Sequence, residues 1–210
     1  MLKLTKITIQ LAEKHLFNDF NALVNPGEVL SIMGPSGCGK STLLDYLSGS
    51  LSPAFQASGS LKLDDQELSH LPIERRNVGI LYQESLLFPH LTNLENLLFA
   101  IPEGIKSKQR SQLALERLSE FNLVDKAYDL PSSLSGGQKA RISLLRTLLS
   151  EPKYLLLDEP FGKLDKTLRD GVRSFVLEQI QRAQLPTILV THDQEDTKEM
   201  GGTCIQLTSS

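Results

Sequence analysis

The sequence predicts an α/β fold, in which helices flank a mostly parallel β-sheet and a helical segment is inserted in the middle of the chain. Two observations lead to this fold class. Short apolar runs of strand length lie in both halves of the chain, at Glu28–Met33, Val78–Tyr82, Tyr154–Leu157 and Thr187–Thr191. Helical patterns occur between these runs, and strands that alternate with helices are typical of a parallel sheet.

The amino terminus, Met1–Lys6, alternates like a β-strand, whereas residues 94 to 128 have a mostly helical pattern. In the segment Lys106–Phe121, the apolar residues Ala114, Leu118 and Phe121 recur at helical spacing on one face. Core packing explains that face without a functional role. Prolines and glycines mark the boundaries of these segments, at Pro53, Gly59, Pro102, Gly104 and Pro131.

Length and composition agree with one globular unit. A chain of 210 residues with 40% hydrophobic content can bury a core and hold one domain with an inserted lobe. We therefore expect residues 1–210 to form a single domain, with a helical subdomain inserted at about residues 84–133. The net charge of −3 is too balanced to suggest a nucleic-acid surface, so we expect no nucleic-acid partner.

Cysteine usage and hydropathy predict a cytoplasmic chain. The two cysteines, Cys38 and Cys204, make neither a disulfide framework nor a metal pattern, which fits a reducing compartment. No apolar run approaches the ~20 residues needed to cross a bilayer, and the amino terminus lacks the apolar centre of a signal peptide. Any membrane association is therefore expected to come through a partner.

A glycine-rich segment fits the Walker A pattern for nucleoside triphosphates. It consists of Gly34, Pro35, Ser36, Gly37, Cys38, Gly39, Lys40 and Ser41, followed by Thr42. A predicted strand precedes it and a predicted helix, Thr42–Ser48, follows it, which is the context that the motif requires. A coincidental glycine-rich turn is the alternative.

The residue types of this segment explain its chemistry. The glycines let successive N–H groups point inward at phosphate oxygens, and the positive end of the following helix adds to the attraction. We expect Lys40 on the β- and γ-phosphates. The Ser41 hydroxyl would ligate Mg²⁺, a hard ion that prefers oxygen ligands, and Thr42 would contact the α- or β-phosphate.

Two carboxylates, Asp158 and Glu159, follow the apolar strand Tyr154–Leu157. Asp158 is suited to hold the magnesium shell, and Glu159 to polarise the attacking water as a general base. The alternative is a pair of solvated acids at the end of a strand.

Two polar residues follow the other predicted strands. Gln83 follows Val78–Tyr82, and its amide could reach the metal or the water; His192 follows Thr187–Thr191 and could contact the γ-phosphate. By themselves, a glutamine at a strand end is usually a surface residue and a single histidine is more often structural.

The stretch Leu134-Ser135-Gly136-Gly137-Gln138 lies between these elements, and with it the chain resembles the nucleotide-binding subunits of ATP-binding-cassette (ABC) transporters. The resemblance covers nearly the whole chain. It implies a P-loop ABC ATPase core with an antiparallel β part at the amino terminus and an inserted helical subdomain. It also implies a head-to-tail homodimer that holds two ATP molecules between subunits. The roles implied for single segments are the family signature at residues 134–138, the Q-loop glutamine Gln83, the D-loop aspartate Asp165 and the switch histidine His192.

The residue types of the signature also suit a role at the dimer interface. Ser135, Gly136 and Gly137 offer a hydroxyl and unhindered amides at the start of a predicted helix, which is the kind of site that binds an anion. The chain already supplies its own phosphate loop. This second site, to which Gln138 also belongs, therefore suits the γ-phosphate bound to a partner subunit. An ordinary helix cap is the alternative.

The segment Gln83–Asn96 is similar to that of bacterial importers of small solutes. Its resemblance implies a groove for a membrane permease, with Phe88, Leu91 and Leu94 as groove residues; core packing is the alternative for each. The chain is similar to short single-domain subunits of the YnjD type and to thiamine, molybdate and iron importer ATPases. Implied partners are an integral-membrane permease and, through it, a periplasmic or extracellular substrate-binding protein, with the chain at the inner face of the cell membrane.

Three features depart from the family pattern. Leu11 occupies the position at which many members stack adenine on an aromatic residue, which puts the strength of base recognition in doubt. Gly162 and Lys163 stand in the D-loop where small or hydroxyl residues are commoner. The sequence ends after residues 204–210, so we expect no control by a carboxy-terminal regulatory domain.

Two other functions remain open at this point. A soluble cassette protein could use ATP to close a clamp in DNA repair, translation or cofactor assembly, although such proteins usually carry a coiled-coil insertion, a second cassette or a basic face. A P-loop kinase of small molecules would keep the Walker A segment but has no use for residues 135–138.

Overall fold

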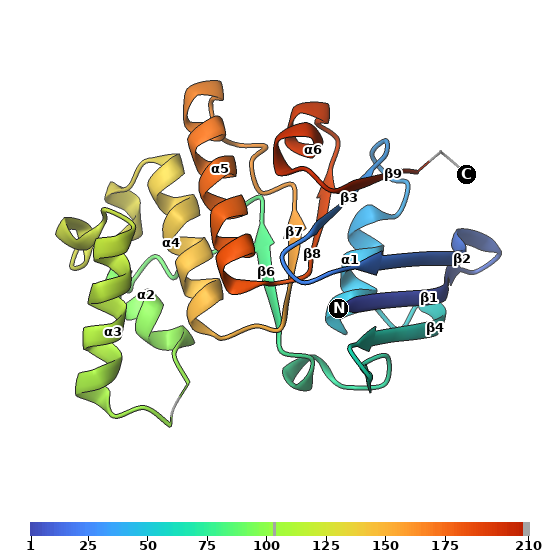
Figure 1. Ribbon diagram of the computed structural model, residues 1–210, viewed down its shortest axis with the longest axis horizontal. Coiled ribbons are helices and arrows are strands. Elements are labelled where there is room, and N and C mark those ends of the chain that lie inside the picture. Colours follow the sequence, from blue (N-terminus) through green and yellow to red (C-terminus); the bar gives the residue numbers. More distant parts are fainter. Residues whose placement is uncertain (103, 208–210) are drawn as a thin grey trace.

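The computed structural model describes residues 1–102 and 104–207, and it has two β-sheets and a helical lobe. Figure 1 shows the helical lobe at one end of the molecule, a five-stranded sheet at the centre and a four-stranded sheet at the other end. Residues 208–210, where we expected the chain to stop without a regulatory domain, lie outside the described residues.

The central sheet has the strand order β6-β7-β8-β3-β9, and every neighbouring pair is parallel. Its strands are β3 (Val29–Met33), β6 (Val78–Tyr82), β7 (Tyr154–Asp158), β8 (Thr187–Thr191) and β9 (Thr203–Gln206). Four of these strands coincide with the apolar runs of the sequence, which confirms the predicted parallel sheet. Strand β9 was not predicted, because its residues carry no apolar run.

Both faces of the central sheet are buried, and side chains that alternate along one strand enter different cores. Tyr154 and Leu156 of β7 point toward α1 (Lys40–Ser48) and the amino-terminal sheet. Leu155 and Leu157 point the other way, toward α5 (Lys166–Ala183). This arrangement explains why the strands are apolar at every position rather than at every second one.

The amino-terminal sheet is antiparallel, with the order β2-β1-β4-β5. Its strands are β1 (Leu2–Leu11), β2 (Lys14–Val24), β4 (Phe55–Leu63) and β5 (Gln66–Glu67). The predicted strand at residues 1–6 is the first half of β1. Leu2, Leu4, Ile7 and Ile9 of β1 are buried against α1 and the central sheet, so the two sheets share one apolar core.

The helical lobe consists of α2 (Asn93–Ala100), α3 (Ser107–Glu120) and α4 (Gly136–Leu149), with short 3-10 turns at Val124–Lys126 and Pro131–Ser133. The predicted apolar face of α3 is confirmed, because Ala114, Leu118 and Phe121 are all buried. Their core continues into Leu145 and Ile142 of α4. The core of the lobe therefore continues beyond residue 133, the predicted end of the inserted subdomain. The domain boundaries remain a prediction.

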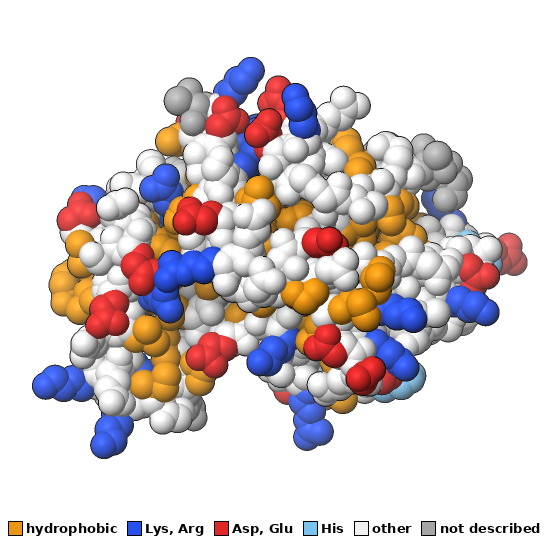
Figure 2. Space-filling model, viewed as in Figure 1, with side chains coloured by type: hydrophobic (Ala, Val, Ile, Leu, Met, Phe, Trp, Pro, Cys, Tyr) orange, Lys and Arg blue, Asp and Glu red, His pale blue; other side chains and the backbone are white. Residues whose placement is uncertain are grey.

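The remaining helices lie along the central sheet. A short 3-10 turn, Ile73–Arg75, precedes β6, and α6 (Gln194–Met200) follows β8. Figure 1 shows α5 between the helical lobe and the sheet. On the face drawn in Figure 2, acidic and basic side chains are interspersed over the surface. No helix in residues 1–102 and 104–207 has the length and apolar character of a membrane span.

Candidate nucleotide site

The strand order brings the predicted site residues to one edge of the central sheet. In the parallel register, Tyr82 pairs with Asp158, Asp158 with Val190, and Thr191 with Met33. The residues that follow these strands therefore emerge at the same carboxyl edge, which is where open parallel sheets bind ligands. Gln83, Glu159, His192 and the segment from Gly34 to Thr42 all begin there.

The segment Gly34–Gly39 forms an open loop that leads into α1. Gly37 has φ 82° and Gly39 has φ 98°, left-handed conformations that side chains rarely adopt. Gly39 is the N-cap of α1 and lies against the side chain of Phe17, which is buried. Local sequence thus produces a curled backbone directly before a helix amino terminus, an arrangement that suits an anion.

Lys40 folds back over this loop and is almost fully buried. Its Nζ donates hydrogen bonds to the carbonyl oxygens of Gly34 at 2.7 Å and Pro35 at 3.0 Å, and it lies 4.0 Å from Cys38 Sγ. Two carbonyls and no carboxylate therefore hold the ammonium group in these contacts. The amine is consequently at the loop itself, where phosphate oxygens could replace the carbonyls.

Asp158 lies at the end of β7, close enough to Lys40 for the lysine charge to act on its carboxyl. Burial raises the pKa of its carboxyl above the ordinary value, the carboxylates of Glu159 and Asp45 raise it further, and Lys40 opposes the rise. A divalent cation at this position would relieve the repulsion between the three acids. The donors that we predicted for Mg²⁺, the Asp158 carboxylate, the Ser41 hydroxyl and the Gln83 amide, can each offer oxygen, so their chemistry fits that ion. Among the described residues, no cluster of three or more His, Cys, Asp or Glu side chains forms a metal site.

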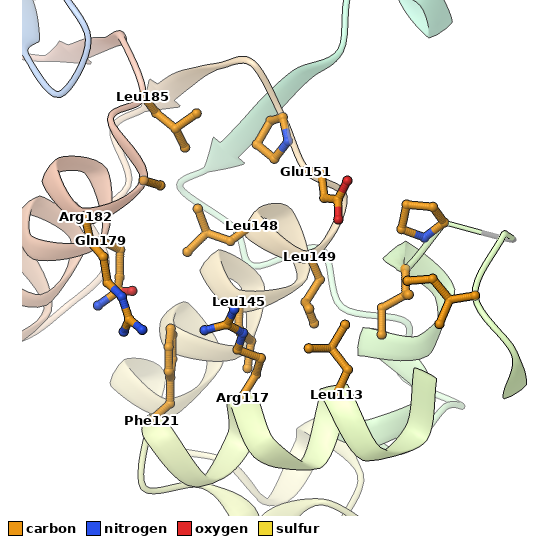
Figure 3. Close-up of a pocket in the computed structure, with 15 residues that line it drawn as sticks. Leu113, Arg117, Phe121, Leu145, Leu148, Leu149, Glu151, Gln179, Arg182 and Leu185 are labelled. Atoms are coloured by element: carbon orange, nitrogen blue, oxygen red, sulfur yellow. The ribbon is translucent and has the colours of Figure 1, made fainter. Parts of the chain in front are cut away.

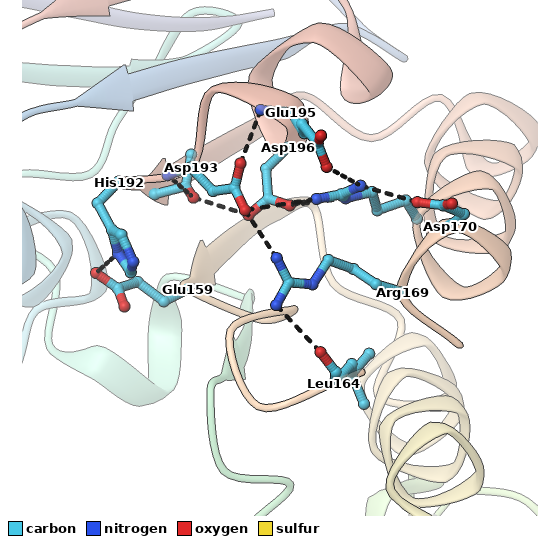
Figure 4. Close-up of polar contacts among 10 residues, drawn as sticks. Glu159, Leu164, Arg169, Asp170, His192, Asp193, Glu195 and Asp196 are labelled. Atoms are coloured by element: carbon cyan, nitrogen blue, oxygen red, sulfur yellow. Dashed lines mark hydrogen bonds and ion pairs between the residues drawn. The ribbon is translucent and has the colours of Figure 1, made fainter. Parts of the chain in front are cut away.

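Glu159 and His192 are in direct contact. His192 Nδ1 lies 3.0 Å from Glu159 Oε1 (Figure 4). Glu159 follows β7 with φ 46°, and its N–H donates to the carbonyl of Val190 in β8. A non-glycine residue in this conformation is uncommon and is often found at functional sites. The pair sits at the strand ends with its imidazole mostly exposed to solvent.

Gln83 lies beside the loop that precedes α5. A Cβ atom at Gly162 would be 2.9 Å from Gln83 Nε2, so the glycine leaves room for the glutamine amide. Next to it, Lys163 Nζ contacts Glu84 Oε1 at 2.5 Å. The unusual Lys163 thus pairs within its own chain, with the residue that follows Gln83.

The segment Ser135–Gln138 lies at the start of α4, in the helical lobe. It is thus separate from the Walker A segment, which lies in the loop after β3. Ser135 Oγ accepts from the Gln138 N–H, and Gln138 Oε1 accepts from the Ser135 N–H at 2.9 Å, which makes a capping box. The cap explains why a helix starts here, and it leaves the Ser135 hydroxyl proton free to donate. Gly137 packs near Leu168 of α5. The first amides of α4 remain compatible with an anion site.

The chain matches the family model described as ABC transporter over residues 17–162, more than half of its length. The chain belongs to the ABC transporter family. As a member of this family it is an ATP-binding protein and an ATPase.

Sequence relatives of this chain agree with its place in the ABC transporter family. It is 41% identical over 196 residues to the uncharacterized ABC transporter ATP-binding protein YnjD of Escherichia coli, covering 93% of this chain and 90% of YnjD. It is 36% identical to the spermidine/putrescine import ATP-binding protein PotA of Pasteurella multocida (99% of this chain, 55% of PotA) and 38% identical to the Fe(3+) ions import ATP-binding protein FbpC of Brucella abortus (90% and 55%). The chain thus spans about half the length of these two relatives.

A solved structure gives the same result. The dimeric structure of MJ0796, a bacterial ABC transporter cassette, superimposes with a TM-score of 0.80 at 29% sequence identity, over 100% of this chain and 95% of that chain. The ABC ATPase fold predicted from the sequence is therefore confirmed.

A cleft of about 450 Å³ opens beside Gln83 in this ABC ATPase. Residues at the end of β6 and directly after it, at the start of α4 and in the loop before α5 line it, among them Leu86, Leu87, Lys139 and Lys163. Of the predicted groove residues, Leu94 is buried in the lobe core, so core packing explains it. Phe88 and Leu91 are half-buried. Arg146 fixes this segment to α4 by donating to the carbonyls of Ser85 and Leu86.

A separate cleft of about 430 Å³ lies between the helical lobe and α5 (Figure 3). Its lining is mainly apolar, with Arg117, Glu151, Gln179 and Arg182 as polar members. None of the predicted site residues lines it. Leu11, the expected adenine position, lies at the end of β1 and is 43% exposed.

Sequence reasoning missed four charged residues behind His192, namely Arg169, Arg173, Asp193 and Asp196. They form ion pairs between α5 and the turn that follows β8 (Figure 4). A signal was present: two arginines four residues apart on one helix and two aspartates three residues apart after His192. Nothing in the sequence, however, brings the two segments together.

Proposed function

We propose that this chain is the ATP-hydrolysing subunit of a bacterial importer of a small solute, and that it drives a separate permease through ATP-dependent closure of two copies. One observation carries the proposal: Ser135–Gln138 lies in a different lobe from the phosphate loop of the same chain. A second copy, turned head to tail, would supply this segment to the bound nucleotide. The similarity to a dimeric cassette and to importer ATPases supports the same reading.

ATP would bind along the segment from Gly34 to Thr42. The curled amides and the amino terminus of α1 would surround the phosphates. Lys40 would exchange its bonds to Gly34 and Pro35 for phosphate oxygens. This exchange needs little movement, because the ammonium group already lies over the loop.

Mg²⁺ would be held by Ser41, Asp158 and Gln83, and when bound it would neutralise phosphate charge. Asp158 is suited to this role because its carboxylate is crowded by other acids. The Gln83 amide lies against Gly162. It would therefore contact the loop before α5 as well as the bound nucleotide and its metal.

Glu159 would accept a proton from the attacking water as the general base. His192, already 3.0 Å from Glu159, would orient that carboxylate and contact the γ-phosphate. Ser135, Gly136, Gly137 and Gln138 of the partner copy would contact the same phosphate from the other side.

The permease would contact the cleft beside Gln83 and the segment around Phe88. Closure of the two copies would move these surfaces and, with them, the permease. An import system of this kind also uses a substrate-binding protein outside the membrane, and it places the ATPase at the inner membrane face. We propose both for this chain by analogy with its importer relatives.

Co-purification tests the transport proposal. The tagged chain would be isolated from detergent-solubilised membranes of its host, with and without ATP, and its partners identified by mass spectrometry. We expect one multi-span permease. Recovery from the soluble fraction alone, with no membrane partner, would instead favour an ATP-driven clamp.

A further inference from the structure

The turn that carries His192 is fixed on both sides of the histidine. Thr191 Oγ1 accepts from the Asp193 N–H at 3.1 Å and donates to Asp196 Oδ2 at 2.8 Å. Asp193 Oδ1 accepts from the Glu195 N–H at 2.8 Å, which caps α6. These bonds connect the residues on both sides of His192 to the side chains of Asp193 and Asp196.

One guanidinium group connects this turn to a different loop. Arg169 Nη1 donates to Asp193 Oδ2 at 2.7 Å, and Arg169 Nη2 donates to the carbonyl of Leu164 at 3.1 Å. Leu164 belongs to the loop Gly162–Asp165, which leads into α5 and lies beside Gln83. Figure 4 shows Arg169 between Leu164 and Asp193. Because the guanidinium is planar and rigid, it fixes the spacing of these two acceptors.

The second arginine of α5 is more deeply buried, and its Nη2 lies 3.8 Å from Asp193 Oδ2, which is farther than the 2.7 Å contact of Arg169. Arg173 Nε donates to Asp196 Oδ1 at 2.7 Å, and the two side chains are only 2% and 3% exposed. Loss of Arg173 would leave the buried Asp196 carboxylate without its ion-pair partner, so this pair is costly to disrupt. Arg169 and Asp193 are 22% and 28% exposed, and their pairing is less costly to lose. The connection made by Arg169 can thus be tested without unfolding the chain.

We propose that Arg169 is a positioning residue for ATP hydrolysis: acting through Asp193, it sets the position of His192 relative to Glu159, and it makes that position depend on the loop Gly162–Asp165. The inference rests on the proposed role of His192. Arg169 itself need not touch the nucleotide. A displacement of the loop, which follows the strand end bearing Glu159, would pull Arg169 and with it the turn of His192.

The test is a mutant cycle in the purified full-length chain, with kcat and KM for ATP hydrolysis, ATP affinity and thermal unfolding measured for each variant. Arg169→Met should lower kcat at least about tenfold, because a misplacement of about 1 Å can cost more than that. ATP affinity should stay within about twofold of wild type, since the phosphate loop is untouched. Arg169→Lys, which has one donor group in place of the fork, should recover only part of the rate.

Arg182→Met is the matched control, because Arg182 lies on the same helix and is 61% exposed. It should leave kcat unchanged. In a His192→Ala background, Arg169→Met should lower kcat no further than about twofold, since Arg169 acts through His192. Equal losses in both backgrounds would show independent effects and overturn the inference, as would wild-type kcat in Arg169→Met.

The same cycle separates this inference from the proposed function. Loss of hydrolysis in His192→Ala together with normal hydrolysis in Arg169→Met would refute the positioning role alone. Normal hydrolysis in His192→Ala would refute the role proposed for His192 and, with it, the positioning role. A loss in Arg169→Met that appears only in KM would also overturn the inference.

Discussion

His192 Nδ1 lies 3.0 Å from Glu159 Oε1, although the two residues come from the ends of different strands. The contact is possible because β7 and β8 are parallel neighbours, with Asp158 paired to Val190. It places an imidazole against the carboxylate that we propose as the general base.

Glu159→Gln should keep nucleotide binding and lose turnover. The amide has nearly the same shape but cannot accept the proton of the attacking water, so the rate of hydrolysis should fall by about 100-fold or more. ATP should then trap a dimer, which size-exclusion chromatography with light scattering would detect. Glu178→Gln, at an exposed glutamate of α5, is the control. Ordinary steady-state hydrolysis by the Glu159→Gln protein would refute the assignment.

Lys40→Ala should abolish nucleotide binding or turnover. The variant loses the ammonium group that would meet the phosphates, and the carbonyls of Gly34 and Pro35 lose their donor. ATP affinity, measured with a fluorescent analogue, and circular dichroism would separate a binding defect from a folding defect. Lys108→Ala, at an exposed lysine of α3, should bind normally. A folded Lys40→Ala protein with normal turnover would contradict the proposed phosphate contact.

Glu67 should make the free energy of unfolding decrease at acidic pH. Burial raises the pKa of Glu67, but hydrogen bonds from the Ser60 and Ser69 hydroxyls and from the Ser69 and Leu61 amides together lower it more, from 4.5 to about 2. The folded protein thus binds this proton more weakly than the unfolded chain. The contribution of Glu67 is fully present above pH 4.5 and is lost as the pH falls toward 2.

Chemical denaturation at several pH values would check this dependence. Glu67→Gln should unfold more easily than wild type at about pH 7, by about 1–2 kcal/mol because the side chain is partly exposed. The difference should shrink as the pH falls from 4.5 toward 2. A difference that does not change with pH would show that the charge of Glu67 is unimportant.

Arg76→Met should destabilise the fold by about 3 kcal/mol. The buried guanidinium donates to four carbonyl oxygens, those of Tyr46, Leu47, Ser69 and Leu71, and two of these belong to the last turn of α1. Methionine would leave all four without this donor. Arg75→Met, at the exposed neighbour, should change the free energy of unfolding by less than about 0.5 kcal/mol. Urea denaturation of both variants measures the difference, and equal stabilities would refute the structural role of Arg76.

The sequence by itself determined the local elements, because their causes are local. Continuous apolar runs specify β3, β6, β7 and β8, and the glycines before Lys40 specify a loop at a helix start. Ser135 and Gln138, three residues apart, specify a helix cap. Each feature depends on neighbours within one turn or one strand, so it can be predicted without knowing the rest of the fold.

Only the tertiary structure decided which of these elements meet. The order β6-β7-β8-β3-β9 depends on burial of both faces of the sheet, and it alone brings Gln83, Asp158 and His192 to one edge. The sequence left two roles for Leu94, in the permease groove or in the core. Its packing with α3 and α4 places it in the core. The pairing of Arg169 with Asp193, 24 residues away, could not be predicted. From the sequence alone, these charged side chains could equally well be exposed to solvent. Only the packing of α5 against the turn of His192 makes them partners.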